Sequence, residues 1–154
     1  MNSIKNWLKG KETIDDLLAL TSEWKVVGNV RLAYQTSVNV KWDCTGDDIT
    51  EICPYTFEDA LIMTNLDLFR NEKLKRMGSI TTISKLLRES LSAIDLQTKI
   101  FKELEAKGGF SKADFANSLL YTEEFEDLTP PGYISDGLKW LKECLDGSGV
   151  DNGK

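Results

Sequence analysis

Histidine is absent from this sequence of 154 residues. Its absence excludes general acid–base catalysis by imidazole, Ser-His-Asp and Cys-His nucleophilic sites, and zinc sites with histidine ligands. Cysteine is scarce. The three cysteines, Cys44, Cys53 and Cys144, are an odd number and have no Cys-x-x-Cys spacing. That pattern favours neither a disulfide framework nor a zinc site. Any catalysis by this chain would therefore depend on carboxylates, lysines and metal ions.

Long apolar runs are also missing. No run approaches the roughly 20 residues of a transmembrane helix, and residues 1–11 carry three lysines but no apolar core of signal-peptide length. We therefore expect a cytoplasmic protein that does not use a membrane as a partner. The length and the 41% content of hydrophobic residues predict one folded domain, or a piece of one, over residues 1–146. Residues 147–154 are polar and rich in glycine, which predicts a flexible tail.

An overall excess of basic residues is missing as well, since the formal net charge is -6. Domains that bind nucleic acid by bulk electrostatics are usually basic, so the composition argues against that mode of binding. One local excess of positive charge lies between residues 70 and 78, where Lys73, Lys75 and Arg76 occur. A solvated linker and a patch that faces phosphate are both open interpretations of this segment.

A central helix is predicted from Phe57 onward. Pro54 ends the preceding segment, Thr56 can serve as the N-cap, and apolar residues follow at helical spacing. The first turn contains two adjacent carboxylates, those of Glu58 and Asp59. Acidic residues at a helix start are favoured by the helix dipole, by roughly 0.3–1 kcal/mol, so a purely structural role is an alternative to metal binding.

The remaining segments predict a mostly helical fold with one or two short strands. Residues 30–35 and 38–42 alternate with period two, which is typical of strands. An apolar stripe over residues 80–104 predicts a long helical segment, which Ser92-Ala93 could divide in two. Ser-x-x-Asp spacing from Ser111 predicts the start of another helix, and a last helix is expected over residues 132–145.

Five blocks of this sequence, taken in order, resemble the C-terminal nuclease region of the overcoming-lysogenization-defect (OLD) family of ATP-dependent endonucleases. Each block is a weak motif by itself, but their order and spacing span nearly the whole chain. The blocks are Asn2-Ser3-Ile4-Lys5-Asn6-Trp7-Leu8, Val30-Arg31-Leu32-Ala33-Tyr34-Gln35, Thr56-Phe57-Glu58-Asp59-Ala60-Leu61-Ile62, Lys112-Ala113-Asp114-Phe115-Ala116 and Pro131-Gly132-Tyr133-Ile134-Ser135-Asp136-Gly137-Leu138-Lys139-Trp140-Leu141.

The resemblance implies a partial Toprim-like α/β fold, predominantly helical in content. Family members join an N-terminal ATPase to a Toprim domain that cuts DNA with two divalent metal ions, which lie about 3.5–4 Å apart in sites of this kind. By its match to the family pattern, Glu58 is expected to ligate Mg²⁺ or Mn²⁺, with Asp59 as its neighbouring ligand. Lys112 matches a lysine placed to stabilise charge on the phosphate, so Glu58 and Lys112 are the expected catalytic residues. The residues expected to bind DNA are Lys112, Lys73, Lys75 and Arg76.

The sequence also departs from the family pattern. It contains neither the Asp-x-Asp pair of a complete Toprim site nor the Gly-x-x-x-x-Gly-Lys-Ser/Thr loop of an ATPase. Pro54-Tyr55 stands where the family usually has Gly-Arg. We therefore expect a truncated or split C-terminal part of an OLD-type Toprim nuclease that is inactive alone. It would bind Mg²⁺ or Mn²⁺ only when a partner segment completes the site.

Two kinds of protein partner are expected. One is a separate chain that carries the ATPase and the Asp-x-Asp pair, and the other is a second copy of this chain in a homo-oligomer. The alternative function, from a different class, is a small acidic helical protein-interaction module without catalytic activity. Strong Mg²⁺ or Mn²⁺ binding that is lost in Glu58→Ala would favour the nuclease over this module.

Overall fold

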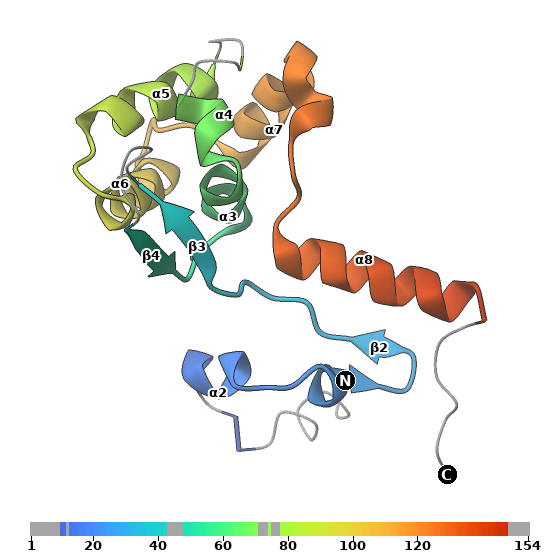
Figure 1. Cartoon of the computed structure of the whole chain (residues 1–154). Coiled ribbons are helices and arrows are strands. Elements are labelled where there is room, and N and C mark those ends of the chain that lie inside the picture. Colours follow the sequence, from blue (N-terminus) through green and yellow to red (C-terminus); the bar gives the residue numbers. More distant parts are fainter. Residues whose placement is uncertain (1–9, 12, 43–47, 71–73, 75–77, 148–154) are drawn as a thin grey trace. The chain divides into compact units, whose positions relative to one another are not determined.

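The computed structural model describes residues 10–11, 13–42, 48–70, 74 and 78–147. The chain forms two compact units. The core unit is Ser37–Pro131, and the terminal unit combines Met1–Thr36 with Gly132–Lys154. The described part of the chain is mostly helical with four short antiparallel strands (Figure 1), which confirms the expected fold class. No helix in that part is long and apolar enough to cross a membrane.

The terminal unit consists of short elements and one longer helix. Its first helix follows a capping box, in which the Thr13 hydroxyl accepts from the Asp16 N–H and the Asp16 carboxylate accepts from the Thr13 N–H. The strand expected over residues 30–35 is confirmed only for its first two residues. The elements are α2 (Ile14–Leu18), the 3₁₀ helix η1 (Glu23–Lys25), β1 (Val26–Val27), β2 (Val30–Arg31) and α8 (Gly132–Leu145). None of the residues whose burial is described in this unit is fully buried.

The core unit begins with a β-hairpin. Strand β3 (Val38–Lys41) confirms the second expected strand, and it pairs antiparallel with β4 (Ile49–Ile52). The sequence analysis missed β4, because its apolar residues Ile49 and Ile52 are three positions apart and do not alternate with period two. In the structure Ile52 is buried while Ile49 is exposed, so β4 contributes a single apolar side chain to the core.

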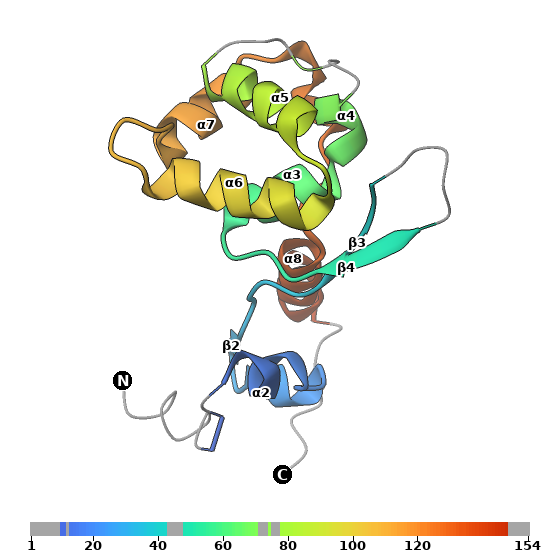
Figure 2. The same ribbon diagram turned by 90° about the vertical axis from the view of Figure 1, so that its left-hand side faces the viewer.

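Helix α3 (Phe57–Thr64) lies at the centre of the core unit (Figures 1 and 2). It contacts β3, α4 (Leu66–Arg70) and α6 (Ala93–Glu105). Its residues from Glu58 to Met63 are all buried, as expected of a helix surrounded by other elements. The hydrophobic cluster consists entirely of core-unit residues, and it includes Ile62, Phe69, Ile83, Leu96, Ile100 and Phe115.

The long helical segment expected over residues 80–104 is two helices, α5 (Ser79–Glu89) and α6. The break occurs next to Ser92, as the sequence suggested, because the Ser92 hydroxyl caps α6 by accepting from the Asp95 N–H. Two more elements complete the unit. They are α7 (Lys112–Leu120) and the 3₁₀ helix η2 (Glu123–Asp127).

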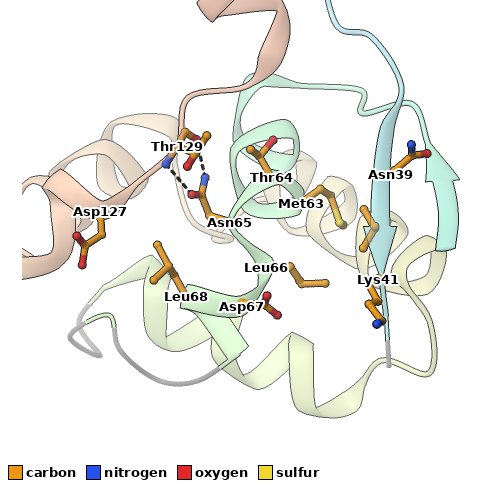
Figure 3. A pocket seen from close by; sticks show the side chains of 11 residues that line it. Asn39, Lys41, Met63, Thr64, Asn65, Leu66, Asp67, Leu68, Asp127 and Thr129 are labelled. Atoms are coloured by element: carbon orange, nitrogen blue, oxygen red, sulfur yellow. Dashed lines mark hydrogen bonds between the residues drawn. The ribbon is translucent and has the colours of Figure 1, made fainter. Parts of the chain in front are cut away.

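Asn65 ends α3 and fastens a distant segment to it. Its amide nitrogen donates to the carbonyls of Leu61 and Thr129, at 2.8 Å each, and its side-chain oxygen accepts from the Thr129 N–H at 2.7 Å. Figure 3 shows the two bonds between Asn65 and Thr129, at a pocket that also borders β3 and α4. The segment that follows η2 is thereby held against the C-terminal end of the central helix.

Candidate active site

The candidate site begins with the capping of α3. The Thr56 hydroxyl accepts from the Asp59 N–H at 3.3 Å, and the Asp59 carboxylate accepts from the Thr56 N–H at 2.7 Å. This reciprocal capping box confirms that Thr56 is the N-cap and that the helix starts at Phe57. Because the helix start is fixed in this way, the side chains of Glu58 and Asp59 project from the first turn in defined directions.

Asp59 is almost completely buried, and both of its carboxylate oxygens already have donors. Oδ1 accepts from the backbone and the hydroxyl of Thr56, at 2.7 and 3.0 Å. Oδ2 accepts from the Tyr55 N–H at 2.8 Å and from the Gln97 amide at 3.4 Å. A carboxylate with four donors is well stabilised where it is, and ligation of a metal ion would compete with these bonds. The expected ligand role of Asp59 therefore gains no support from its geometry.

Glu58, unlike Asp59, has a carboxylate oxygen that is not hydrogen-bonded. Its side chain is only 6% exposed, yet its Oε2 atom accepts no hydrogen bond of good geometry. The charge partner of Oε2 is the Lys112 ammonium, whose nitrogen lies 3.1 Å away. A buried carboxylate is costly unless it is paired, so this one lysine provides the main compensation. Glu58 is thus an oxygen donor held within the fold with little of its acceptor capacity used.

Lys112 is the first residue of α7, and its side chain is 67% exposed. A cation at a helix N-terminus is opposed by the helix dipole, by roughly 0.3–1 kcal/mol. The negative charge of Glu58 offsets this cost. The start of α7 is stabilised separately by the Ser111 hydroxyl, which accepts from the Asp114 N–H at 3.0 Å. The fold therefore brings together the two expected catalytic residues, although they are far apart in the sequence.

The described residues do not supply a metal centre by themselves. Within that part of the chain there is no group of three or more Asp, Glu, Cys or His side chains that could hold a metal ion. Mg²⁺ takes near-octahedral oxygen ligands, and Glu58 would contribute at most two of them. A metal ion that used Glu58 would need further ligands from another polypeptide segment or from water. The expected DNA-binding residues Lys73, Lys75 and Arg76 lie outside the described residues.

Gln97 is a site residue that the sequence analysis missed. Its amide donates to the Cys53 carbonyl at 2.7 Å and to Asp59 Oδ2 at 3.4 Å, so it supports the segment that leads into α3. A signal for it does exist in the sequence. Gln97 shares the buried face of α6 with Ala93, Leu96 and Ile100, and a polar residue on an apolar helical stripe indicates a specific partner.

The sequence of this chain is similar to part of a known endonuclease. The chain is 30% identical to Endonuclease GajA from Bacillus cereus (strain HuB5-5) in an alignment 143 residues long that covers 90% of this chain. The chain spans only 19% of the length of that endonuclease. No protein-family model matches the sequence, and no solved structure matches it significantly. The similarity covers most of both units and includes Glu58 and Lys112 within its extent, so this chain is related in sequence to about a fifth of an endonuclease.

Proposed function

We propose that this chain is part of the nuclease region of an OLD-type, metal-dependent DNA endonuclease. In this proposal Glu58 and Lys112 belong to a phosphodiester-cleaving site that another polypeptide segment completes. The observation that carries the proposal is the 3.1 Å contact between these two side chains. The family resemblance selected both residues from separate sequence blocks, and the similarity to an endonuclease spans both blocks.

The two side chains differ in a way that suits such a site. Glu58 is buried and fixed on the first turn of a capped helix, so its carboxylate is held in place before any ligand arrives. Lys112 is mostly exposed, and its long side chain can turn from the carboxylate toward a phosphate group. When bound, a divalent metal ion would polarise the phosphate and activate water. Glu58 would be one of the residues that hold it, and Lys112 would stabilise negative charge on the phosphate.

A chimeric endonuclease tests this proposal. The residues of this chain would replace the matching fifth of Endonuclease GajA, and plasmid nicking would be measured with Mg²⁺ and with Mn²⁺. We expect this chain alone to be inactive and the chimera to nick DNA. Glu58→Gln and Lys112→Met should each reduce nicking by the chimera at least about 100-fold, the scale of losing one transition-state contact.

The matched controls are Glu51→Gln and Lys107→Met, which change exposed residues of the same types in the core unit. Both control chimeras should nick DNA at the unchanged rate. Nicking that is equally fast with Glu58→Gln would overturn the role of the pair. Metal-dependent nicking by this chain alone, lost in Glu58→Gln, would show instead that the site is complete without a partner.

The terminal unit favours a second candidate function, that of a protein-interaction module. None of its residues with described burial is buried, while Trp24, Leu138 and Leu145 are more than half exposed. Exposed apolar side chains on a unit with so little core are typical of surfaces that bind another protein. Light scattering at increasing concentration would test self-association, and substitution of Leu138 and Leu145 by Ser should then reduce it. A monomer at all concentrations would exclude the homo-oligomer.

A further inference from the structure

Exposed Tyr55 and half-buried Phe101 form an aromatic corner next to the candidate site. Tyr55 precedes the N-cap of α3 and is 62% exposed, and Phe101 lies on α6. Their ring centroids are 5.5 Å apart, and their planes meet at 71°. In this edge-to-face arrangement one ring presents its edge to the face of the other. The two rings are therefore walls of a corner that is open to solvent.

The corner is part of a pocket with a basic residue at its border. Tyr55, Thr98, Phe101 and Lys102 line this pocket, whose volume is about 520 Å³. That volume falls within the range of roughly 300–1,000 Å³ that is usual for small-ligand pockets. Lys102 is exposed and follows Phe101 directly on α6, so its ammonium can reach an anionic group bound beside the rings.

Hydrogen bonds fix both walls of this corner to the candidate site. The Tyr55 N–H donates to Asp59 Oδ2 at 2.8 Å. The Gln97 amide, one helical turn before Phe101, donates to the Cys53 carbonyl at 2.7 Å. The backbone on either side of the corner is therefore held before any ligand binds, which lowers the entropic cost of binding. Glu58 is three positions after Tyr55 in the sequence, so their Cα atoms are at most roughly 11 Å apart.

We propose that Tyr55 and Phe101 form a stacking platform for a nucleobase of the DNA strand next to the cleaved phosphate. This inference rests on the proposed nuclease function, which places DNA at the Glu58–Lys112 pair. A nucleobase offers a flat π face that stacks on an aromatic ring, and such stacking tolerates every base. Lys102 would contact the phosphate of the stacked nucleotide. Because a base in a duplex is already stacked on its neighbours, the platform selects a strand that is single-stranded or locally opened.

Binding of a single-stranded thymidine oligonucleotide without divalent metal tests the platform separately from cleavage. Fluorescence anisotropy at low salt would measure the dissociation constant for the full chain and its variants. We expect Tyr55→Ala to weaken binding about 5- to 150-fold, the range that corresponds to loss of one base–aromatic stack. Tyr55→Phe should bind like the unmodified protein, because stacking does not need the hydroxyl group.

The matched control is Tyr121→Ala, since Tyr121 is also more than half exposed but lies at the end of α7. This variant should keep the unmodified affinity. Photo-crosslinking with an oligonucleotide that contains 5-iodouracil would locate the bound base, and we expect adducts on the peptides of Tyr55 or Phe101. No binding by the unmodified protein, equal losses in Tyr55→Ala and Tyr121→Ala, or adducts confined to other peptides would each overturn the platform.

The two proposals fail in different ways. Glu58→Gln should abolish nicking by the chimera while leaving oligonucleotide binding and the crosslink unchanged. Binding that depends on Tyr55 would support the platform even if nicking did not depend on Glu58. Binding unaffected by Tyr55→Ala, with nicking still dependent on Glu58, would overturn the platform alone.

Discussion

The Lys112 ammonium lies 3.1 Å from Glu58 Oε2, and the two residues occupy the first turns of different helices. The pair is asymmetric, because the carboxylate is buried while the lysine is mostly exposed to water. Removal of one partner therefore has a different consequence for each residue. Without the lysine, a charged group is left inside the fold with poor compensation, whereas without the carboxylate the lysine is simply hydrated.

Lys112→Met is accordingly expected to lower the free energy of unfolding by about 1–2 kcal/mol. Breaking a fully buried pair costs roughly 3–5 kcal/mol, and the exposure of Lys112 reduces that value. Urea denaturation followed by circular dichroism would measure the change. Lys107→Met is the control and should stay within about 0.5 kcal/mol of the unmodified protein.

A double variant, Lys112→Met with Glu58→Gln, tests more directly whether Lys112 compensates the buried carboxylate. When Glu58→Gln is added to Lys112→Met, much of the lost stability should return, because a neutral amide does not need a cation. Equal stabilities for Lys112→Met and Lys107→Met would mean that Lys112 does not compensate the buried carboxylate.

Asn65→Ala is expected to lower the free energy of unfolding by about 2 kcal/mol. The substitution removes the bonds to Leu61 and Thr129, and a buried polar group that loses its partner typically costs about 1–3 kcal/mol. Asn65→Asp keeps the acceptor for the Thr129 N–H but loses the amide donor and adds a negative charge at a helix C-terminus, so it should also destabilise. The control is Asn39→Ala on the exposed side of β3, which should be nearly neutral. Denaturant midpoints that match for Asn65→Ala and Asn39→Ala would contradict this prediction.

Stability in acid should depend on Asp95 at the junction of α5 and α6. Hydrogen bonds from Lys99 and from the Leu91 N–H hold the pKa of this carboxyl below its usual value of 3.8. The unfolded chain therefore binds this proton more readily than the folded chain does. The resulting stabilisation is present above the ordinary pKa and is lost as the pH falls through the lower folded value.

Urea titrations between neutral pH and strong acid would measure this dependence. In Asp95→Asn the free energy of unfolding should change less steeply with pH in the acid range than in the unmodified protein. Asp67→Asn is the control, because Asp67 is 81% exposed in a long contact with Arg70. A slope that is the same in all three proteins would show that Asp95 makes no contribution.

Local chemistry explains which parts of the fold the sequence predicted well. The starts of α3, α6 and α7 are encoded by a Thr or Ser with an Asp three residues later, so each could be recognised within four residues of sequence. Strand β4 has no such local signature. It exists because β3 provides a partner for its backbone, and pairing of that kind is not visible in four residues.

The candidate site depends on contacts that spacing alone does not reveal. Periodicity placed Glu58 on a first turn and Lys112 at a helix start, but nothing in either segment indicates that they meet. Only the family resemblance joined them, and the structure brings their side chains into contact. The family resemblance also implied that both Glu58 and its neighbour Asp59 are metal ligands. The structure distinguishes the two side chains, because Asp59 stands three residues after Thr56 and forms the reciprocal cap, whereas Glu58 does not.

The division into units has a consequence for the order in which the chain folds. The core unit is one uninterrupted stretch, whereas the terminal unit combines Met1–Thr36 with Gly132–Lys154. The hydrophobic cluster lies entirely between Ser37 and Pro131, so the core unit can close it without contacts from the rest of the chain. The terminal unit must bring α8 together with α2 and the β1–β2 hairpin, and the whole core unit lies between them in the sequence, so the entropy cost of closing that loop is lower once the core unit has folded. We therefore expect the core unit to fold before the terminal unit.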